Sequence, residues 1–146
     1  MPNVNFKAKA LNALASFSIL LFMMAGCNTA SAQQKGLMIR ISEIEIEPLY
    51  LEEYKALLEE EAAASVKLEQ GVIAIFPMYE KEATTQIRIL EMYADKTSYE
   101  QHLKTPHFQK YKTTTLKMVK SLKLIDMEAI DVATMPLLFR KLKEQK

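Results

Sequence analysis

The sequence contains two histidines, His102 and His107, and both lie in one short segment. Imidazole gains and loses a proton near neutral pH, so either ring suits general acid–base catalysis. Glu91 and Tyr93 are two residues apart in an apolar segment, so they share one face of the strand expected there. If that face meets the helices, Glu91 orients the His102 ring and Tyr93 lines a pocket. The alternative is that Glu91 and His102 form a buried hydrogen-bonded pair with a structural role only.

The predicted catalytic residues are therefore His102 and Glu91. The predicted substrate-binding residues are Tyr93, His107, Phe108, Tyr111 and Arg88. Phe108 and Tyr111 would hold an aromatic ring, although a helix core uses the same side chains. For His107 the alternative is a surface or capping role at a helix start. Arg88 is expected on the strand face opposite Glu91. A buried guanidinium there needs a charged partner, which could lie across a dimer, and the alternative to substrate binding is a structural role.

No metal site is predicted. A spacing of five does not place His102 and His107 on one helical face, and Pro106 lies between them. The single cysteine, Cys27, excludes an internal disulfide and a cysteine-based zinc cluster. Phosphate-binding glycine loops, nucleophile elbows and dinucleotide-binding fingerprints are all absent from the sequence.

The elements that must position these residues follow from periodicity and turn signals. The sequence predicts strands at 37–46, 72–79, 85–94 and 122–130, and helices at 49–70, 98–104, 107–120 and 135–143. A phase change near Ser42 and Glu43 suggests a bulge in the first strand. The order β-α-β-β-α-β is the ferredoxin-like split βαβ, an α+β fold in which an antiparallel four-stranded sheet carries both helices on one face.

Within the first long helix, a ridge that includes Tyr54 and Leu58 is expected to face the sheet. The acidic run 59–61 is expected to be a solvated face rather than a cation site. Gly71 is expected to end the helix in the left-handed conformation. Because the strands are apolar on both faces, the uncovered face predicts a symmetric homodimer built sheet to sheet.

The first 32 residues contain no acidic residue, and two lysines precede an apolar run at 11–24. This pattern is typical of a secretory signal. Cys27 lies where a bacterial lipobox places its lipidated cysteine. The segment 30–32 instead matches an ordinary signal-peptidase site. A third possibility is an uncleaved membrane anchor. The predicted organisation is a signal at 1–26, a tether at 27–36, the domain at 37–131 and a tail at 132–146. The protein is expected to be exported, as a membrane-anchored lipoprotein of the bacterial envelope or otherwise as a periplasmic protein.

The chain has 146 residues, and 19 Lys and Arg balance 18 Asp and Glu. This length suits a single domain. The balanced charge gives no basic face, so nucleic acid is not an expected partner.

Three segments, 71–79, 86–95 and 99–108, resemble the antibiotic biosynthesis monooxygenase (ABM) family, in particular its quinol-monooxygenase-like members. The most specific feature is an acidic-x-aromatic strand end followed by a helix with His-x-x-x-Pro-His-Phe. The resemblance covers residues 37–131 and implies a dimeric α+β barrel. Several members oxidise phenolic or quinol-type compounds with dioxygen and without metal or flavin, others degrade haem, and relatives of the fold are isomerases.

The haem-degrading members use a Trp and, ten residues later, a His. This sequence has His102 and Lys112 at those positions, which disfavours haem degradation. The resemblance thus implies a cofactor-independent monooxygenase, an oxidoreductase acting on a small phenolic or quinol-type aromatic, with His102 as the base. The alternatives are an isomerase or mutarotase of the same fold and a non-catalytic envelope protein that binds a small ligand. Dioxygen uptake separates the first from the other two.

Overall fold

The computed structural model describes residues 36–145. The sheet consists of β1 (Met38–Ile46), β2 (Val72–Glu80), β3 (Ala83–Tyr93) and β4 (Val119–Met127). The helices are η1 (Pro48–Tyr50), α1 (Leu51–Leu68), α2 (Lys96–His102), α3 (Pro106–Thr115) and α4 (Met135–Glu144). The predicted signal sequence and Cys27, with all of the tether but Gly36, lie outside the described residues. None of the described helices is both long and apolar enough to span a membrane.

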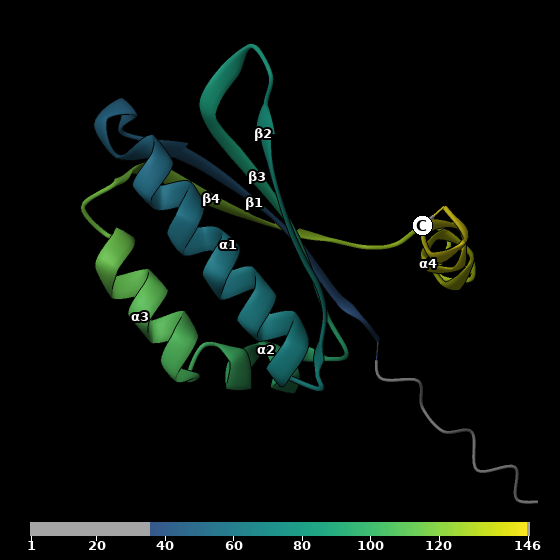
Figure 1. The fold of residues 1–146 in the computed structure, drawn as a ribbon. Coiled ribbons are helices and arrows are strands. Elements are labelled where there is room, and N and C mark those ends of the chain that lie inside the picture. The colour runs from purple at the N-terminus through teal and green to yellow at the C-terminus, as the bar shows by residue number, and fades with distance from the viewer. Residues whose placement is uncertain (1–35, 146) are drawn as a thin grey trace, which may run out of the picture. The chain divides into compact units, whose positions relative to one another are not determined.

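The four strands form one antiparallel sheet in the order β2-β3-β1-β4. Figure 1 shows α1 and α3 lying side by side on one face of this sheet, with α2 near their ends. The predicted ferredoxin-like α+β fold is confirmed, and so is the tail helix α4. The core lies between α1 and the sheet, and its most deeply buried members are Ile46, Tyr54, Ile87 and Met118.

The strand β1 keeps one alternation throughout, which corrects the predicted bulge near Ser42. Ser42, Ile44 and Ile46 are all buried on the helix-covered face. The pairing with β3 runs from Met38 to Glu45 without a shift, and the one register shift with β4 falls between Glu45 and Ile46. The apparent phase change arises because a buried serine occupies a position where the pattern requires an apolar residue.

The helix α3 ends at Thr115, five residues before the predicted end, and β4 begins correspondingly early at Val119. Three consecutive threonines close the helix, a residue type that disfavours the helical state because its side chain is stiff near the backbone. The fully buried Met118 then joins the core, and its carbonyl accepts a hydrogen bond from the Glu47 amide.

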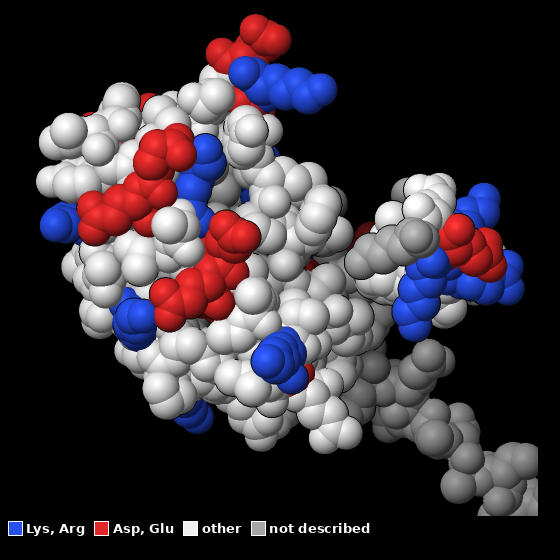
Figure 2. Space-filling model, viewed as in Figure 1, with Lys and Arg blue, Asp and Glu red and all other residues white. Residues whose placement is uncertain are grey.

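The helix α1 differs from prediction in two ways. Its acidic face is only partly solvated: acidic side chains gather over α1 in Figure 2, but Glu61 is 4% exposed and turns inward. Gly71 does not adopt a left-handed conformation, since no described glycine has a positive φ. Its role is a close approach, because a Cβ at this position would lie 2.4 Å from Ser98 Oγ at the start of α2.

The close contact between Gly71 and Ser98 predicts that Gly71→Ala destabilises the domain. The added methyl group would displace Ser98, whose amide and hydroxyl both donate hydrogen bonds to Asp95 at the N-cap of α2. Overpacking of this kind lowers the free energy of unfolding by about 1–3 kcal/mol. Urea unfolding followed by circular dichroism measures the change. Gly36→Ala is the control, because a Cβ there meets nothing within 4 Å; equal stability of the two variants would contradict the prediction.

Candidate active site

A cavity of about 290 Å³ lies between the sheet and the three helices α1, α2 and α3. Its polar and aromatic lining includes Ser42, Tyr54, Glu91, Tyr93, Tyr99, His102, Phe108 and Tyr111. Three exposed leucines, Leu116, Leu122 and Leu124, also line it and place its opening along β4 and the end of α3. The cavity is therefore an apolar, aromatic-walled pocket with a small number of polar groups, as binding sites for small organic molecules usually are.

Glu91 is the acidic side chain among the residues that line this pocket. The Ser42 hydroxyl donates a hydrogen bond to Oε1 of Glu91, and the Tyr93 hydroxyl donates one to Oε2 at 2.9 Å. All three residues come from β1 and β3 and share the helix-covered face, because residues two apart on a strand point the same way. Both carboxylate oxygens are thus fixed in position, and each keeps a lone pair for a further donor.

Two tyrosine hydroxyls form a second polar group in the wall. Tyr54 from α1 and Tyr111 from α3 are hydrogen-bonded through their hydroxyl oxygens at 2.5 Å. Burial raises the pKa of Tyr54 to about 12, and it raises the pKa of Tyr111 as well. Burial, together with the charge of Glu91, also raises the pKa of Tyr93. All three phenols therefore stay protonated at neutral pH and act as hydrogen-bond donors rather than bases.

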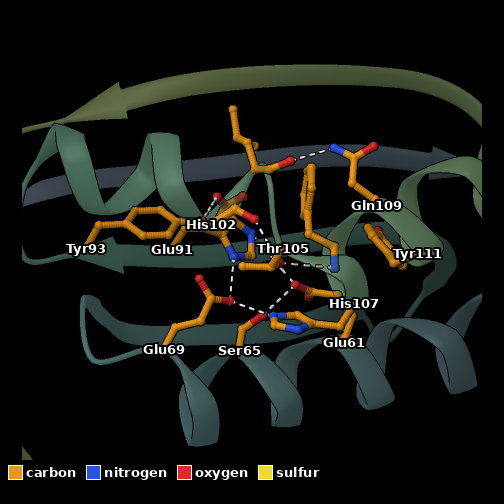
Figure 3. A network of polar contacts seen from close by, with 12 residues as sticks. Glu61, Ser65, Glu69, Glu91, Tyr93, His102, Thr105, His107, Gln109 and Tyr111 are labelled. Atoms are coloured by element: carbon orange, nitrogen blue, oxygen red, sulfur yellow. Dashed lines mark hydrogen bonds and ion pairs between the residues drawn. The ribbon is translucent and has the colours of Figure 1, made fainter.

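His102 lines the pocket with its ring, but its nitrogens are directed to carboxylates outside the pocket lining. The residue is 2% exposed, and its ring packs against Phe108 at 4.6 Å and Tyr93 at 5.5 Å between ring centroids. Nδ1 lies 3.0 Å from Glu69 Oε1, and Nε2 lies 3.7 Å from Glu61 Oε1 (Figure 3). The predicted Glu91–His102 pair is therefore wrong, because α2 ends at His102 with the imidazole edge facing α1.

His107 lies on the same carboxylate as His102. Its Nε2 is 2.6 Å from Glu69 Oε1, and the two imidazole centroids are 6.5 Å apart. The spacing of five residues does not separate the two rings, which corrects the prediction, because a turn and not a continuous helix joins the two residues. Thr105 shapes that turn: its hydroxyl donates to the His102 carbonyl and accepts from the Phe108 amide, which makes it the N-cap of α3.

Two glutamates of the α1 segment face the histidines, and their pKa values are shifted in opposite directions. Burial raises the pKa of Glu61, although the Ser65 hydroxyl donates to it at 2.7 Å and His102 lies nearby. Burial also acts to raise the pKa of Glu69, but hydrogen bonds from His102 and His107 outweigh it and hold this pKa below its usual value. Glu69 is consequently a carboxylate that receives both imidazoles.

Arg88 is on the outer face of the sheet and does not line the pocket. Its guanidinium binds Glu80 of the same chain at 2.8 Å and lies 4.0 Å from Glu43. Arg40 is the guanidinium that lines the pocket. It forms an ion pair with Asp126 at 2.6 Å and lies over the Tyr99 ring at 4.7 Å from the centroid.

Of the predicted site residues, the structure brings five into the pocket: His102, Glu91, Tyr93, Phe108 and Tyr111. His107 and Arg88 lie outside it. The residues that sequence reasoning missed are Arg40, Ser42, Tyr54, Tyr99 and the Glu61–Glu69 pair. A signal existed for Ser42, since it interrupts the apolar alternation of β1. Arg40, two residues earlier, is a second polar residue on that face.

Comparison with known proteins agrees with this fold. The sequence profile of the family described as "Antibiotic biosynthesis monooxygenase" matches residues 38–114, from the start of β1 to the penultimate residue of α3. This span includes Glu91, His102 and most of the pocket. The fold and pocket thus define a ferredoxin-like α+β protein with a helix-covered cavity, and the chain belongs to the antibiotic biosynthesis monooxygenase family.

Several solved structures are similar. The chain is 47% identical to a "Putative antibiotic biosynthesis monooxygenase" from Bacteroides thetaiotaomicron, with a TM-score of 0.65, over 66% of this chain and 91% of that one. A "putative monooxygenase" from Lactobacillus acidophilus is 25% identical, with a TM-score of 0.62, over 64% of this chain and 44% of that one. A Nitrosomonas europaea protein at 15% identity (TM-score 0.63, 68% and 95% covered) shares the fold. A search of curated proteins found no match.

Proposed function

We propose that this protein is a monooxygenase that oxidises a small phenolic or quinol-type aromatic with dioxygen. The observation that carries the proposal is the carboxylate of Glu91, fixed by Ser42 and Tyr93 in a pocket with aromatic walls. A phenolic substrate would place its ring between the apolar walls and its hydroxyl on Glu91. The family and the two monooxygenase-named neighbours at 25% identity or more support the reaction type.

The residues of the pocket would act on the proton of the substrate. A phenol gives up an electron to dioxygen far more readily as its anion, so an acceptor for the hydroxyl proton promotes the reaction. Glu91 is that acceptor in our proposal, in place of His102, whose ring nitrogens are directed to Glu69 and Glu61. His102 supports the pocket through its packing on Phe108 and Tyr93.

The proposed assembly is a homodimer that joins the outer faces of two sheets. In support, that face carries exposed apolar side chains, among them Phe76, Met78 and Met127. The described helices α1, α2 and α3 cover only the other face (Figure 1). A second sheet would remove these side chains from water, which is the usual arrangement for a sheet that is apolar on both sides.

Isotope labelling tests the proposed reaction. The purified protein is supplied with an anthrone-type phenol under ¹⁸O₂, where the substrate CH₂ becomes a carbonyl. In a balanced reaction, one oxygen atom enters the product and the other leaves as water. We expect saturable dioxygen uptake and one ¹⁸O per product, above the autoxidation measured without protein.

Uptake with hydrogen peroxide and no incorporated label would contradict the monooxygenase and indicate an oxidase. Binding of the aromatic without any uptake across a panel of hydroquinones and anthrones would favour a ligand-binding protein. Turnover of the same compounds without dioxygen would favour an isomerase.

A further inference from the structure

Three metal-ligating atoms converge beside the pocket, on residues that take no proton in the proposed reaction. They are Oε1 of Glu69, Nδ1 of His102 and Nε2 of His107, and all lie within 4.8 Å of one another. The carboxylate oxygen is 3.0 Å from the first nitrogen and 2.6 Å from the second (Figure 3). We propose that these residues form a binding site for a divalent transition-metal ion, of the zinc type.

The choice of ion follows from the donor set. Two neutral imidazoles and one carboxylate suit Zn²⁺ and its neighbours in the first transition row, whereas Mg²⁺ and Ca²⁺ prefer all-oxygen ligands. Zinc binds such ligands at about 2.0–2.2 Å, which sets tetrahedral donor atoms roughly 3.3 Å apart. The present separations of the donors are 3.0 Å and 2.6 Å, and none exceeds 4.8 Å, so shifts of roughly 1 Å per atom would bring them to that arrangement. A solvent molecule would complete the tetrahedron.

The site is fixed before any ion binds. Glu69 is the C-cap residue of α1, and its amide donates to the Ser65 carbonyl. Between the two histidines, Thr105 donates both its amide and its hydroxyl to the His102 carbonyl. The turn that joins α2 to α3 therefore holds the two imidazoles at a set separation, which lowers the conformational entropy lost on binding.

A further carboxylate lies on the outer side of one ligand. Glu61 is buried, and its Oε1 is 3.7 Å from Nε2 of His102, the nitrogen that faces away from Glu69. Metal-binding histidines commonly have such a carboxylate on the second ring nitrogen, where it orients the ring and makes it a better ligand. In the proposed site, Glu61 would be the carboxylate on the second ring nitrogen of His102, and the ion would lie between His102 and Glu69.

The ion would join the end of α1 to the α2–α3 turn. His102 is 3% exposed at its side chain, whereas Glu69 and His107 are 13% and 20% exposed, so the ion would enter from the side of these two residues. Neither Glu69 nor His107 lines the pocket that contains Glu91. The ion would therefore lie outside the pocket, and it would act on the pocket only by fixing His102 in the wall.

Calorimetric titration of the chelator-treated full chain with ZnCl₂ tests the proposal. All proteins carry Cys27→Ser, which removes the one thiol as a competing ligand. We expect one Zn²⁺ per chain, and a higher melting temperature with Zn²⁺ than with Mg²⁺. Glu69→Gln and His107→Asn should each weaken binding by more than the roughly 10- to 100-fold that loss of an outer-shell partner brings.

Glu60→Gln is the matched control, because it makes the same carboxylate-to-amide change on α1 at an exposed side chain paired with Lys110. It should bind Zn²⁺ as the parent does. Either of two results would overturn the site: no Zn²⁺ binding by the folded parent at 100-fold molar excess, or equal affinity in the parent and both ligand variants. Because His107 is partly exposed, His107→Asn keeps the test valid even where Glu69→Gln fails to fold.

Discussion

Replacing Glu91 by glutamine is expected to lower kcat by about 100-fold to 10,000-fold, the usual contribution of a positioned acid–base group. The amide keeps the shape of the side chain and still accepts from one hydroxyl, but it takes no proton from a bound phenol. Binding of the aromatic ring depends on the walls formed by Phe108, Tyr111 and their neighbours, so KM should change far less. Initial rates of dioxygen uptake over a range of substrate concentrations separate the two parameters.

Glu82→Gln is the matched control for this prediction. Glu82 is exposed in the turn between β2 and β3, so the same chemical change is made away from the pocket. Circular dichroism and melting temperature establish that each variant is folded. Equal kcat for the parent and Glu91→Gln would remove Glu91 from the mechanism and return the role of base to another group.

Tyr93 and Ser42 position Glu91, and their variants test this role. Tyr93→Phe and Ser42→Ala each remove one of the two donors to the carboxylate. A carboxylate that is held by one donor instead of two is less well oriented toward the substrate hydroxyl, so kcat should fall in each variant while KM changes little. Initial rates of dioxygen uptake over a range of substrate concentrations measure both parameters, and an unchanged kcat in both variants would contradict the positioning role.

The sheet and helices could be predicted from sequence because burial imposes a simple alternation on most of the chain. The prediction from sequence failed where forces other than burial decide the local structure. The end of α3 was missed because a threonine run shortens a helix whose apolar pattern continues. The sequence pattern predicts a backbone role for Gly71, but the structure requires glycine there for close packing against Ser98, a residue 27 positions away.

The sequence predicted five residues of the pocket but not the contacts between them. The sequence pattern predicts that Glu91, Tyr93 and His102 lie near one another, and in the structure all three line one pocket. Which carboxylate meets His102 depends on how α2 packs against α1, and Glu69 is 33 residues away in sequence. The phase change near Ser42 does mark a special position. It reflects a polar side chain that lines the pocket and binds Glu91, and not the predicted bulge in the backbone.

The last prediction concerns alkaline pH, where the free energy of unfolding should fall steeply above about pH 10, the usual pKa of tyrosine. Burial raises the pKa of Tyr54 to about 12 and that of Tyr93 and Tyr111 also, so the folded state keeps their protons while the unfolded state loses them. Above pH 10 the unfolded chain binds fewer protons than the folded one, and stability therefore decreases as pH rises. For Tyr54 alone, the shift of the pKa from 10.0 to about 12 lowers the free energy of unfolding by about 2 kcal/mol at pH 12, at 1.36 kcal/mol per pKa unit.

Urea unfolding at pH 8 to 11 measures this loss, and absorbance at 295 nm should show the phenolates forming together with unfolding. The double variant Tyr54→Phe, Tyr111→Phe removes both partners of one hydrogen bond, a change that is often nearly neutral in stability. Its stability should fall less steeply with pH. Tyr79→Phe, at an exposed side chain, should leave the dependence unchanged. If the free energy of unfolding of the double variant fell with pH as steeply as that of the parent, Tyr54 and Tyr111 would not be the source of the alkaline sensitivity.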